Sequence, residues 1–118
     1  MNWKKTLESG TLIVLSTTNV DGSPHSNVVT SKGFIDDKLL INNCQMKTTI
    51  KNIQNNSSVC IIVQKNDEYY RIKGKTKIYS SGKYFEAAIK RNRPPPVKSA
   101  VVVDIIEVFD LDKLLKIF

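Results

Sequence analysis

Hydrophobic and polar positions alternate with a period of two along much of the chain, which is the pattern of a half-buried β-strand. The alternation is cleanest in residues 69–79. One face there carries Tyr70, Ile72, Gly74, Thr76 and Ile78, and the other carries Arg71, Lys73, Lys75 and Lys77. Apolar runs rich in branched residues predict further strands at 11–17, 59–63 and 99–109. Residues 25–31 give a strand antiparallel to the first, and 33–41 give a hairpin that turns at Asp36-Asp37.

A helical spacing interrupts this pattern at two places. The first is a helix over 46–53, with Met46, Ile50 and Ile53 on one face. Because the preceding apolar run ends at Asn42-Asn43, we expect this helix to begin near Cys44 or Gln45. The second helix runs from Lys83 to about Arg91, must stop before Pro94-Pro95-Pro96, and buries Phe85, Ala88 and Ile89.

The two ends of the chain are predicted to be helical as well. A short N-terminal helix ends between Thr6 and Gly10, with Trp3 and Leu7 as its apolar stripe. A last apolar turn of helix carries Leu111, Leu114, Leu115 and Phe118. Six closely spaced strands with inserted helices favour a mostly β fold, a small six-stranded antiparallel barrel, over a βαβ sheet. At 118 residues we expect one domain, 1–118.

Composition excludes several classes of protein. No apolar run approaches the roughly 20 residues of a membrane span, and no apolar segment of a signal peptide follows Met1. Two cysteines 16 residues apart and a single histidine leave too few common ligands for a zinc site. We therefore expect Cys44 and Cys60 to be reduced thiols in the cytoplasm, with Cys60 in the core, and no metal.

The net charge of +7 favours anionic ligands, and its distribution is more informative than its size. No Asp or Glu occurs between Lys38 and Asn66, and Lys47 falls in the first turn of the first predicted helix. A lysine there meets the positive end of the helix dipole, which is unfavourable unless an anion is bound. With the hydroxyls of Thr48 and Thr49, Lys47 would form a phosphate cradle. The alternative is a solvated lysine beside indifferent surface threonines.

Several segments together resemble a known family. The most specific are Gly22-x-Pro24-His25, after the first strand, and Met46-Lys47-Thr48-x-x-x-Asn52-Ile53. Over residues 3 to 110 the chain resembles the pyridoxamine 5'-phosphate oxidase-like flavoproteins, a family of FMN-binding split β-barrels, and most closely their small single-domain members. This resemblance implies a six-stranded antiparallel split barrel that binds FMN.

The resemblance also implies roles for particular residues. Lys47 and Thr48, with Thr49, would hold the FMN phosphate, and members are usually homodimers with FMN at the interface. Pro96 and Lys98 would reach the flavin of a partner chain. The strand and loop residues implied to contact the cofactor are Asn27, Val28, Val29, Thr30, Asn42, Asn43, Cys44 and Met46.

The chain departs from the substrate-processing oxidases of this family. It is shorter, it lacks a C-terminal Arg-x-His-type extension, and it has Thr49 where many members carry Arg or Lys. Oxidation of pyridoxine phosphate is therefore not expected. The resemblance favours a flavin-dependent oxidoreductase or electron carrier, and it leaves a deazaflavin cofactor or a flavin store as alternatives. We expect His25 to be structural.

Two further expectations come from individual strands. In 99–109 both faces are largely apolar, with Val101, Val103, Ile105 and Phe109 on one and Val102, Ile106 and Val108 on the other. An outward apolar face needs a covering element, which supports a dimer. The basic face of 69–79, flanked by Tyr69 and Tyr79, raises a rival function, binding of single-stranded nucleic acid without a flavin. A solvated strand face is the simpler interpretation, and we expect neither nucleic acid nor membrane as a partner.

Overall fold

The computed structural model describes residues 3–92 and 96–118, and within them the chain forms six long strands, one two-residue strand and three short helices. The helices are α1 (Trp3–Thr6), α2 (Lys47–Asn55) and α3 (Gly82–Lys90). The strands are β1 (Leu12–Thr18), β2 (Pro24–Ile35), β3 (Lys38–Asn43), β4 (Ser58–Lys65), β5 (Glu68–Tyr79), β6 (Ser99–Asp110) and β7 (Leu115–Lys116). Pro94 and Pro95, which were expected to end the second helix, lie outside the described residues.

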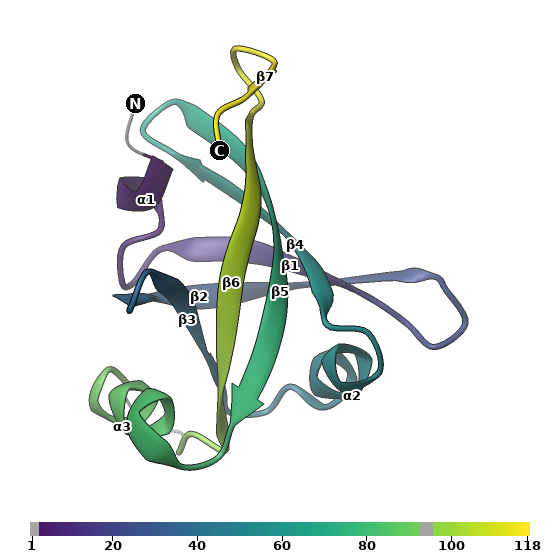
Figure 1. Ribbon diagram of the computed structural model, residues 1–118, viewed down its shortest axis with the longest axis vertical. Helices are drawn as coiled ribbons and strands as arrows, with labels where there is room; N and C mark the ends of the chain where they lie inside the picture. Colours follow the sequence, from purple (N-terminus) through teal and green to yellow (C-terminus); the bar gives the residue numbers. More distant parts are fainter. Residues whose placement is uncertain (1–2, 93–95) are drawn as a thin grey trace.

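All strand pairings are antiparallel, and the sheet closes on itself. Its order is β3-β2-β1-β4-β5-β6-β7, and an additional pairing of β3 with β6 completes the barrel. Figure 1 shows β5 and β6 crossing in front of β1 and β2, with α2 and α3 near the lower end of the view and α1 near the upper end. The predicted six-stranded antiparallel barrel with inserted helices is confirmed.

The hairpin turns follow from residues that tolerate left-handed backbone. Asp36 and Asp37, between β2 and β3, have φ of 51° and 64°. Positive φ at both central residues is the type I′ turn, whose twist matches that of an antiparallel hairpin. Asn66 and Asp67 repeat this geometry between β4 and β5, with φ of 52° and 65°. The predicted turn at Asp36-Asp37 is confirmed.

The barrel interior is filled by the inward side chains of the strands. On β5 the predicted alternation is confirmed, because Tyr70, Ile72, Gly74 and Thr76 are buried while Lys73, Lys75 and Lys77 are exposed. A second, smaller cluster lies between α3 and the outer side of the sheet, and it contains Leu40, Ala88, Ala100 and Val102. Ile89 is exposed on α3, so its predicted burial is wrong, whereas the predicted burial of Ala88 is confirmed.

The predicted faces of the last long strand are partly wrong. Val108 was expected opposite Val101 and Val103, yet all three belong to the interior core. Val102 does face outward, but the cluster beneath α3 covers it. Ile106 remains exposed. The apolar outer face that seemed to require a second chain is therefore mostly accounted for within one chain.

A β-bulge causes this change of phase. Lys73 pairs with Glu107 and the next residue, Gly74, pairs with Ile105, so that Ile106 is the extra residue on β6. Because side chains alternate between the two faces of a sheet, one extra residue moves every later residue of that strand to the opposite face from the one predicted. A Cβ at Gly74 would lie 2.7 Å from the Asp104 carbonyl oxygen, so the close approach of the two strands at the bulge requires glycine.

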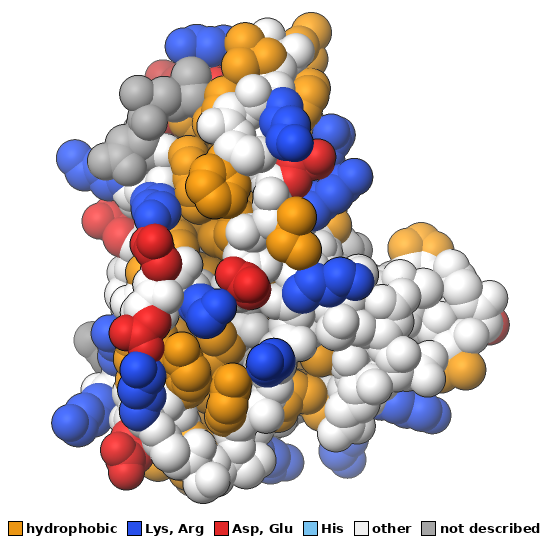
Figure 2. All heavy atoms as spheres, viewed as in Figure 1, with side chains coloured by type: hydrophobic (Ala, Val, Ile, Leu, Met, Phe, Trp, Pro, Cys, Tyr) orange, Lys and Arg blue, Asp and Glu red, His pale blue; other side chains and the backbone are white. Residues whose placement is uncertain are grey.

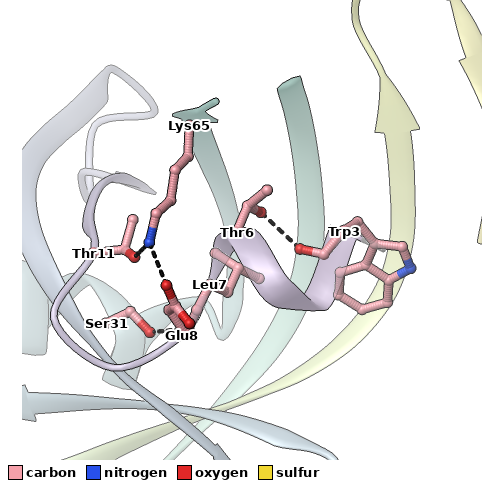
Figure 3. A network of polar contacts seen from close by, with 7 residues as sticks. All are labelled: Trp3, Thr6, Leu7, Glu8, Thr11, Ser31 and Lys65. Atoms are coloured by element: carbon pink, nitrogen blue, oxygen red, sulfur yellow. Dashed lines mark hydrogen bonds and ion pairs between the residues drawn. The ribbon is translucent and has the colours of Figure 1, made fainter. Parts of the chain in front are cut away.

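The N-terminal segment closes one end of the barrel. Trp3 and Leu7 are buried, which confirms the predicted apolar stripe. Figure 3 shows the polar contacts that fix the segment. The Ser31 hydroxyl donates to the Leu7 carbonyl at 2.6 Å, and Lys65 Nζ contacts both Glu8 at 2.7 Å and Thr11 at 3.0 Å.

The predicted C-terminal helical turn is wrong. The chain instead makes a turn after β6 and returns as β7, where Leu115 pairs with Asp110. Asp110 accepts hydrogen bonds from the backbone N–H groups of Asp112 and Lys113, which stabilises the turn. Leu114 has a φ of 57°, a left-handed conformation that ends helical geometry there. No helix within residues 3–92 and 96–118 has the length and apolar character needed to cross a bilayer.

Candidate cofactor site

The first turn of α2 presents positive charge at the lower end of the barrel. The helix begins at Lys47, two to three residues later than predicted, because Met46 adopts extended backbone as the N-cap. Asn43 explains the late start, since its Oδ1 accepts a hydrogen bond from the Met46 N–H at 2.9 Å and holds the chain in a turn before the helix. The preference of Asn for such local backbone contacts competes with helix formation.

The donors of this turn are left open to solvent. Lys47 and Thr48 are exposed, and the first turn contains no acidic residue. Among the described residues, no side chain caps the helix and no carboxylate pairs with Lys47. Backbone N–H groups of a first turn have no partner inside their own helix. Together with the lysine they form a site suited to an anion.

Thr49 has a different environment from Thr48. It is only 1% exposed, and its Oγ1 accepts a hydrogen bond from Asn27 Nδ2 of β2 at 2.7 Å. Asn52, one turn later, donates to Thr17 Oγ1 at 3.0 Å and to Asn19 Oδ1 at 2.9 Å. These buried amides lock α2 to β1 and β2, so Thr49 and Asn27 position the helix rather than present groups to solvent.

A groove of about 280 Å³ lies between the end of β3, the strand β2 and the end of α3. Its lining includes five of the residues that the sequence predicted, namely Val29, Thr30, Asn42, Cys44 and Met46. It also includes three residues that the sequence analysis missed, Lys32, Gln45 and Asn92. Asn92 enters from the end of α3, a contribution that only the folded chain reveals, and its Nδ2 lies 3.9 Å from Cys44 Sγ.

The two asparagines at the end of β3 are fixed by different parts of the chain. Asn43 is buried and donates from Nδ2 to Ser99 Oγ at 2.9 Å. Asn42 donates from Nδ2 to the Ala88 carbonyl of α3 at 3.0 Å. The Asn42 Oδ1 is buried and has no hydrogen-bond partner within the described part of the chain. Leaving a buried acceptor unpaired costs about 1–3 kcal/mol.

The remaining predicted contacts lie around the groove. Val28 points outward from β2 and is 67% exposed. Pro96 is exposed, and Lys98 approaches the end of β3 through its backbone N–H, which donates to the Asn43 carbonyl at 2.8 Å. The structure thus brings Lys98 beside the end of β3 in its own chain. Contact with a partner chain's flavin stays a prediction.

Two side chains outside the groove, Cys60 and His25, carry groups that could take part in chemistry. Cys60 is half-exposed on the outer side of β4, so its predicted burial in the core is wrong. Partial burial raises the pKa of its thiol, and nearby Arg71 and Lys73 act in the opposite direction. His25 is half-buried near the start of β2, where it pairs with Thr17 in the ladder.

The basic face of β5 is engaged with its neighbours. Arg71 stacks on Phe109 with 4.7 Å between its guanidinium carbon and the ring centre, and Lys75 Nζ donates to Ser58 Oγ at 2.6 Å. Lys73 lies 4.0 Å from Glu107. Figure 2 shows acidic and hydrophobic side chains among the basic ones on the side of β5 and β6 that it draws. This pattern favours the solvated strand face over a continuous surface for nucleic acid.

Comparison of the sequence with known protein families identifies the family to which this chain belongs. The sequence pattern of the family described as pyridoxamine 5'-phosphate oxidase matches residues 2–112. The chain belongs to the pyridoxamine 5'-phosphate oxidase-like family of FMN-binding split barrels. The resemblance stated from the sequence is confirmed. A search of curated proteins found no match.

Several solved structures share the fold of this chain at low sequence identity. HupZ of Group A Streptococcus has 22% identity and a TM-score of 0.85, with 98% of this chain and 95% of that chain covered. An FMN-binding protein of Syntrophomonas wolfei has 16% identity and a TM-score of 0.76, covering 93% and 82%. A structure described as F420 reductase has 20% identity and a TM-score of 0.74, covering 92% and 96%. At these identities the likeness shows a shared fold.

The residues of this split barrel fit a flavin nucleotide. The first turn of α2 offers a lysine, an exposed threonine hydroxyl and free N–H groups to a phosphate. The groove offers apolar contacts from Val29 and Met46, and the polar side chains of Thr30 and Gln45 also line it. An isoalloxazine ring is apolar on its faces and polar at its edge, which matches these surroundings.

Proposed function

We propose that this split barrel is an FMN-binding flavoprotein that acts as a flavin-dependent oxidoreductase or electron carrier in the cytoplasm. The observation that carries the proposal is Lys47, exposed at the N-terminus of α2 with no acidic residue in that turn. A cation at this position is unfavourable in the protein alone and becomes favourable when a phosphate dianion binds. Membership of an FMN-binding family supports FMN as the source of that phosphate.

The chain's own residues would bind and orient the cofactor. Lys47 and Thr48 would donate to the phosphate, while Thr49 and Asn27 hold the helix in register with β2. The groove between β2 and β3 would take the ring system. A bound flavin supplies the hydride and electron transfer chemistry itself, and the protein tunes it through contacts and electrostatics.

A homodimer is part of the proposal. The surface that supports it is the outward face of β1, β2 and β4, and not the face of β6 on which the sequence argument relied. The outward face of β1, β2 and β4 carries neighbouring apolar residues, with Val14 paired to both Val28 and Ile62. Leu12, on the same face, is 65% exposed. Exposed apolar patches of this kind favour protein association. Because β2 also lines the groove, an interface here would place the cofactor beside the second chain.

The cofactor is tested by its spectrum and by titration. Freshly purified protein with FMN should show flavin absorption near about 375 and 450 nm. The apoprotein should bind FMN more tightly than riboflavin, because riboflavin lacks the phosphate that Lys47 would hold. Titration with a deazaflavin in parallel decides between the two cofactor classes. A protein that is colourless and takes up none of these ligands would exclude the proposed function.

The dimer is tested by a substitution that introduces a charged side chain on the outward face of β1, β2 and β4. Val28→Lys should convert a dimer seen by light scattering at micromolar concentration into a monomer, because it places two lysines at or near a two-fold contact. Lys51→Glu, on the exposed side of α2, is the control and should leave the oligomeric state unchanged. Wild-type protein that is monomeric with FMN bound would contradict the dimer and leave the cofactor assignment intact.

A further inference from the structure

A second cavity, of about 240 Å³, lies on the outer side of β5 and β6. Three lysines line it: Lys38 at the start of β3, and Lys75 and Lys77 on β5. Because β6 lies between those two strands and pairs with both, closure of the barrel brings the three lysines to one place. This β5–β6 cavity shares no lining residue with the groove between β2 and β3.

The positive charge of the β5–β6 cavity is only partly neutralised. Among its described lining residues Asp104 is the one carboxylate, and its Oδ1 lies 3.3 Å from Lys38 Nζ. Lys75 Nζ donates to the Ser58 hydroxyl instead. Lys77 is exposed and has neither a hydrogen bond nor an ion pair with any residue in the ranges 3–92 and 96–118. A cleft concentrates the field of such an excess charge and attracts anions.

The β5–β6 cavity also has an apolar side. Tyr79 and Val102 belong to its lining, and because Val102 is almost fully buried, the half-buried Tyr79 has the more accessible apolar surface. The Tyr79 ring is held against Tyr84 of α3, with 4.9 Å between the ring centroids. Small-molecule sites combine apolar surface with a few polar groups that fix the orientation of the ligand. Lysines beside a fixed aromatic ring match an anion that carries an organic group.

We propose that the β5–β6 cavity binds a small organic phosphate monoester, with its phosphate on Lys75 and Lys77 and its apolar body on Tyr79. Lysine ammonium groups bind phosphate through charge and through their three donors. Asp104 repels such an anion and competes with it for Lys38, so this carboxylate weakens the binding. The site is separate from the proposed flavin site, and its ligand does not depend on whether the protein binds FMN.

The probe for this site is phenyl phosphate. It is titrated at constant ionic strength into isotope-labelled Lys47→Ala protein, in which the first turn of α2 competes less for phosphate, and NMR follows the backbone amides. The shifts should saturate and should be largest in residues 75–79 and 102–104. Inorganic phosphate should bind at least about threefold more weakly, because it has no apolar body to bury. Shifts that do not saturate would overturn the site, and equal affinities for the two probes would overturn the assignment of an organic ligand.

Two lysines on the same face of β5 provide a matched pair of variants in this background. Lys77→Ala should weaken the binding of phenyl phosphate roughly three- to fivefold. Lys73 is also exposed on that face but lies outside the cavity lining, so Lys73→Ala removes the same charge and should change the affinity less than about twofold. The amide spectra confirm that both variants are folded. Equal losses in the two variants would overturn the site and assign the binding to the net charge of the protein.

Two carboxylates on β6 provide a second pair with the opposite sign. Asp104→Asn should strengthen the binding of phenyl phosphate roughly two- to threefold, because it removes a repulsive charge and releases Lys38. Glu107 lies 4.0 Å from Lys73 and outside the cavity lining, so Glu107→Gln is the control and should have a smaller effect. Binding by Asp104→Asn that is no tighter than binding by Glu107→Gln would overturn the placement of the phosphate in this cavity.

Discussion

The two ends of the barrel differ in how completely the chain satisfies its own polar groups. At the end closed by α1, the Ser31 hydroxyl donates to the Leu7 carbonyl and accepts from the Gly33 N–H, and Lys65 contacts Glu8 (Figure 3). At the end that carries α2, the first turn is uncapped by any described side chain and the Asn42 Oδ1 is unmatched. The first end is complete without a ligand. The second has exposed donors that the phosphate of a nucleotide would match.

The difference leads to a general distinction between stabilising and binding residues. Substitutions at the closed end should change the free energy of unfolding and leave the ligand affinity of the folded protein unchanged. Substitutions of exposed groups at the α2 end should change the ligand affinity and leave the free energy of unfolding nearly unchanged. Thr49 lies at the α2 end but is buried, so a substitution there tests whether burial or position decides between an effect on stability and an effect on ligand affinity.

Leu7→Ala should have the largest effect and should act on stability alone. Leu7 is fully buried between α1 and the barrel core, and removing its side chain should lower the free energy of unfolding by about 2–5 kcal/mol. Urea denaturation of the apoprotein measures this change. Leu114→Ala, at a residue that is 74% exposed, is the control and should change it by less than about 0.5 kcal/mol. Similar losses in both variants would contradict the assignment of Leu7 to the core.

Lys47→Ala should weaken FMN binding without destabilising the fold. Losing a charge-assisted contact of about 1.5–3 kcal/mol corresponds to a roughly ten- to hundredfold loss of affinity. The apoprotein should be unchanged or slightly more stable, because an unfavourable charge–dipole interaction is removed. Fluorescence titration and thermal unfolding measure the two quantities.

Two controls sharpen the Lys47 test. Lys51→Ala, one helical turn further along, should affect FMN binding much less. Riboflavin should bind wild type and Lys47→Ala almost equally, since it has no phosphate. An unchanged affinity of Lys47→Ala for FMN would place the phosphate elsewhere and leave this lysine as a tolerated surface residue.

Thr49→Val and Thr48→Val should separate the buried threonine from the exposed one. Thr49→Val keeps the side-chain shape but removes the acceptor for Asn27 Nδ2, so it should cost about 1 kcal/mol of stability. Thr48→Val should leave the stability of the apoprotein within about 0.5 kcal/mol and weaken FMN binding. Denaturation and titration of both variants decide the matter; a stability loss in Thr48→Val alone would reverse the assignment.

Glu8→Gln should have the smallest effect, and the effect should depend on pH. The hydrogen bond from Lys65 lowers the pKa of Glu8, so the pair contributes stability above the usual pKa of a glutamate and loses it as the pH falls through the lowered value. Wild type should melt slightly above Glu8→Gln at pH 7. The difference should disappear as the pH falls through the lowered pKa of Glu8, because the carboxyl is then protonated. A difference that persists in acid would point to packing instead of charge.

The sequence by itself determined the elements that depend on local chemistry. The period-two pattern fixed the faces of β5, and the Asp36-Asp37 pair fixed the turn between β2 and β3. The lysine at the start of α2 marked the candidate anion site, which stays a prediction. Each of these follows from a few neighbouring residues, whose side-chain spacing or backbone preference acts within one element. The family motif is local in the same sense, because Lys47 and Asn52 lie on one helix.

Only the tertiary structure decided the features that need two distant segments. The bulge beside Gly74 reversed the face of Val108, because strand phase depends on the partner strand and not on the sequence of one strand. Asp110 holds the turn that returns the chain as β7 in place of the expected helix. The orphaned oxygen of Asn42 depends on the Ala88 carbonyl, 46 residues away, which takes the other end of its carboxamide. A contact between segments that far apart has no signature in local spacing, because it exists only once the barrel has folded.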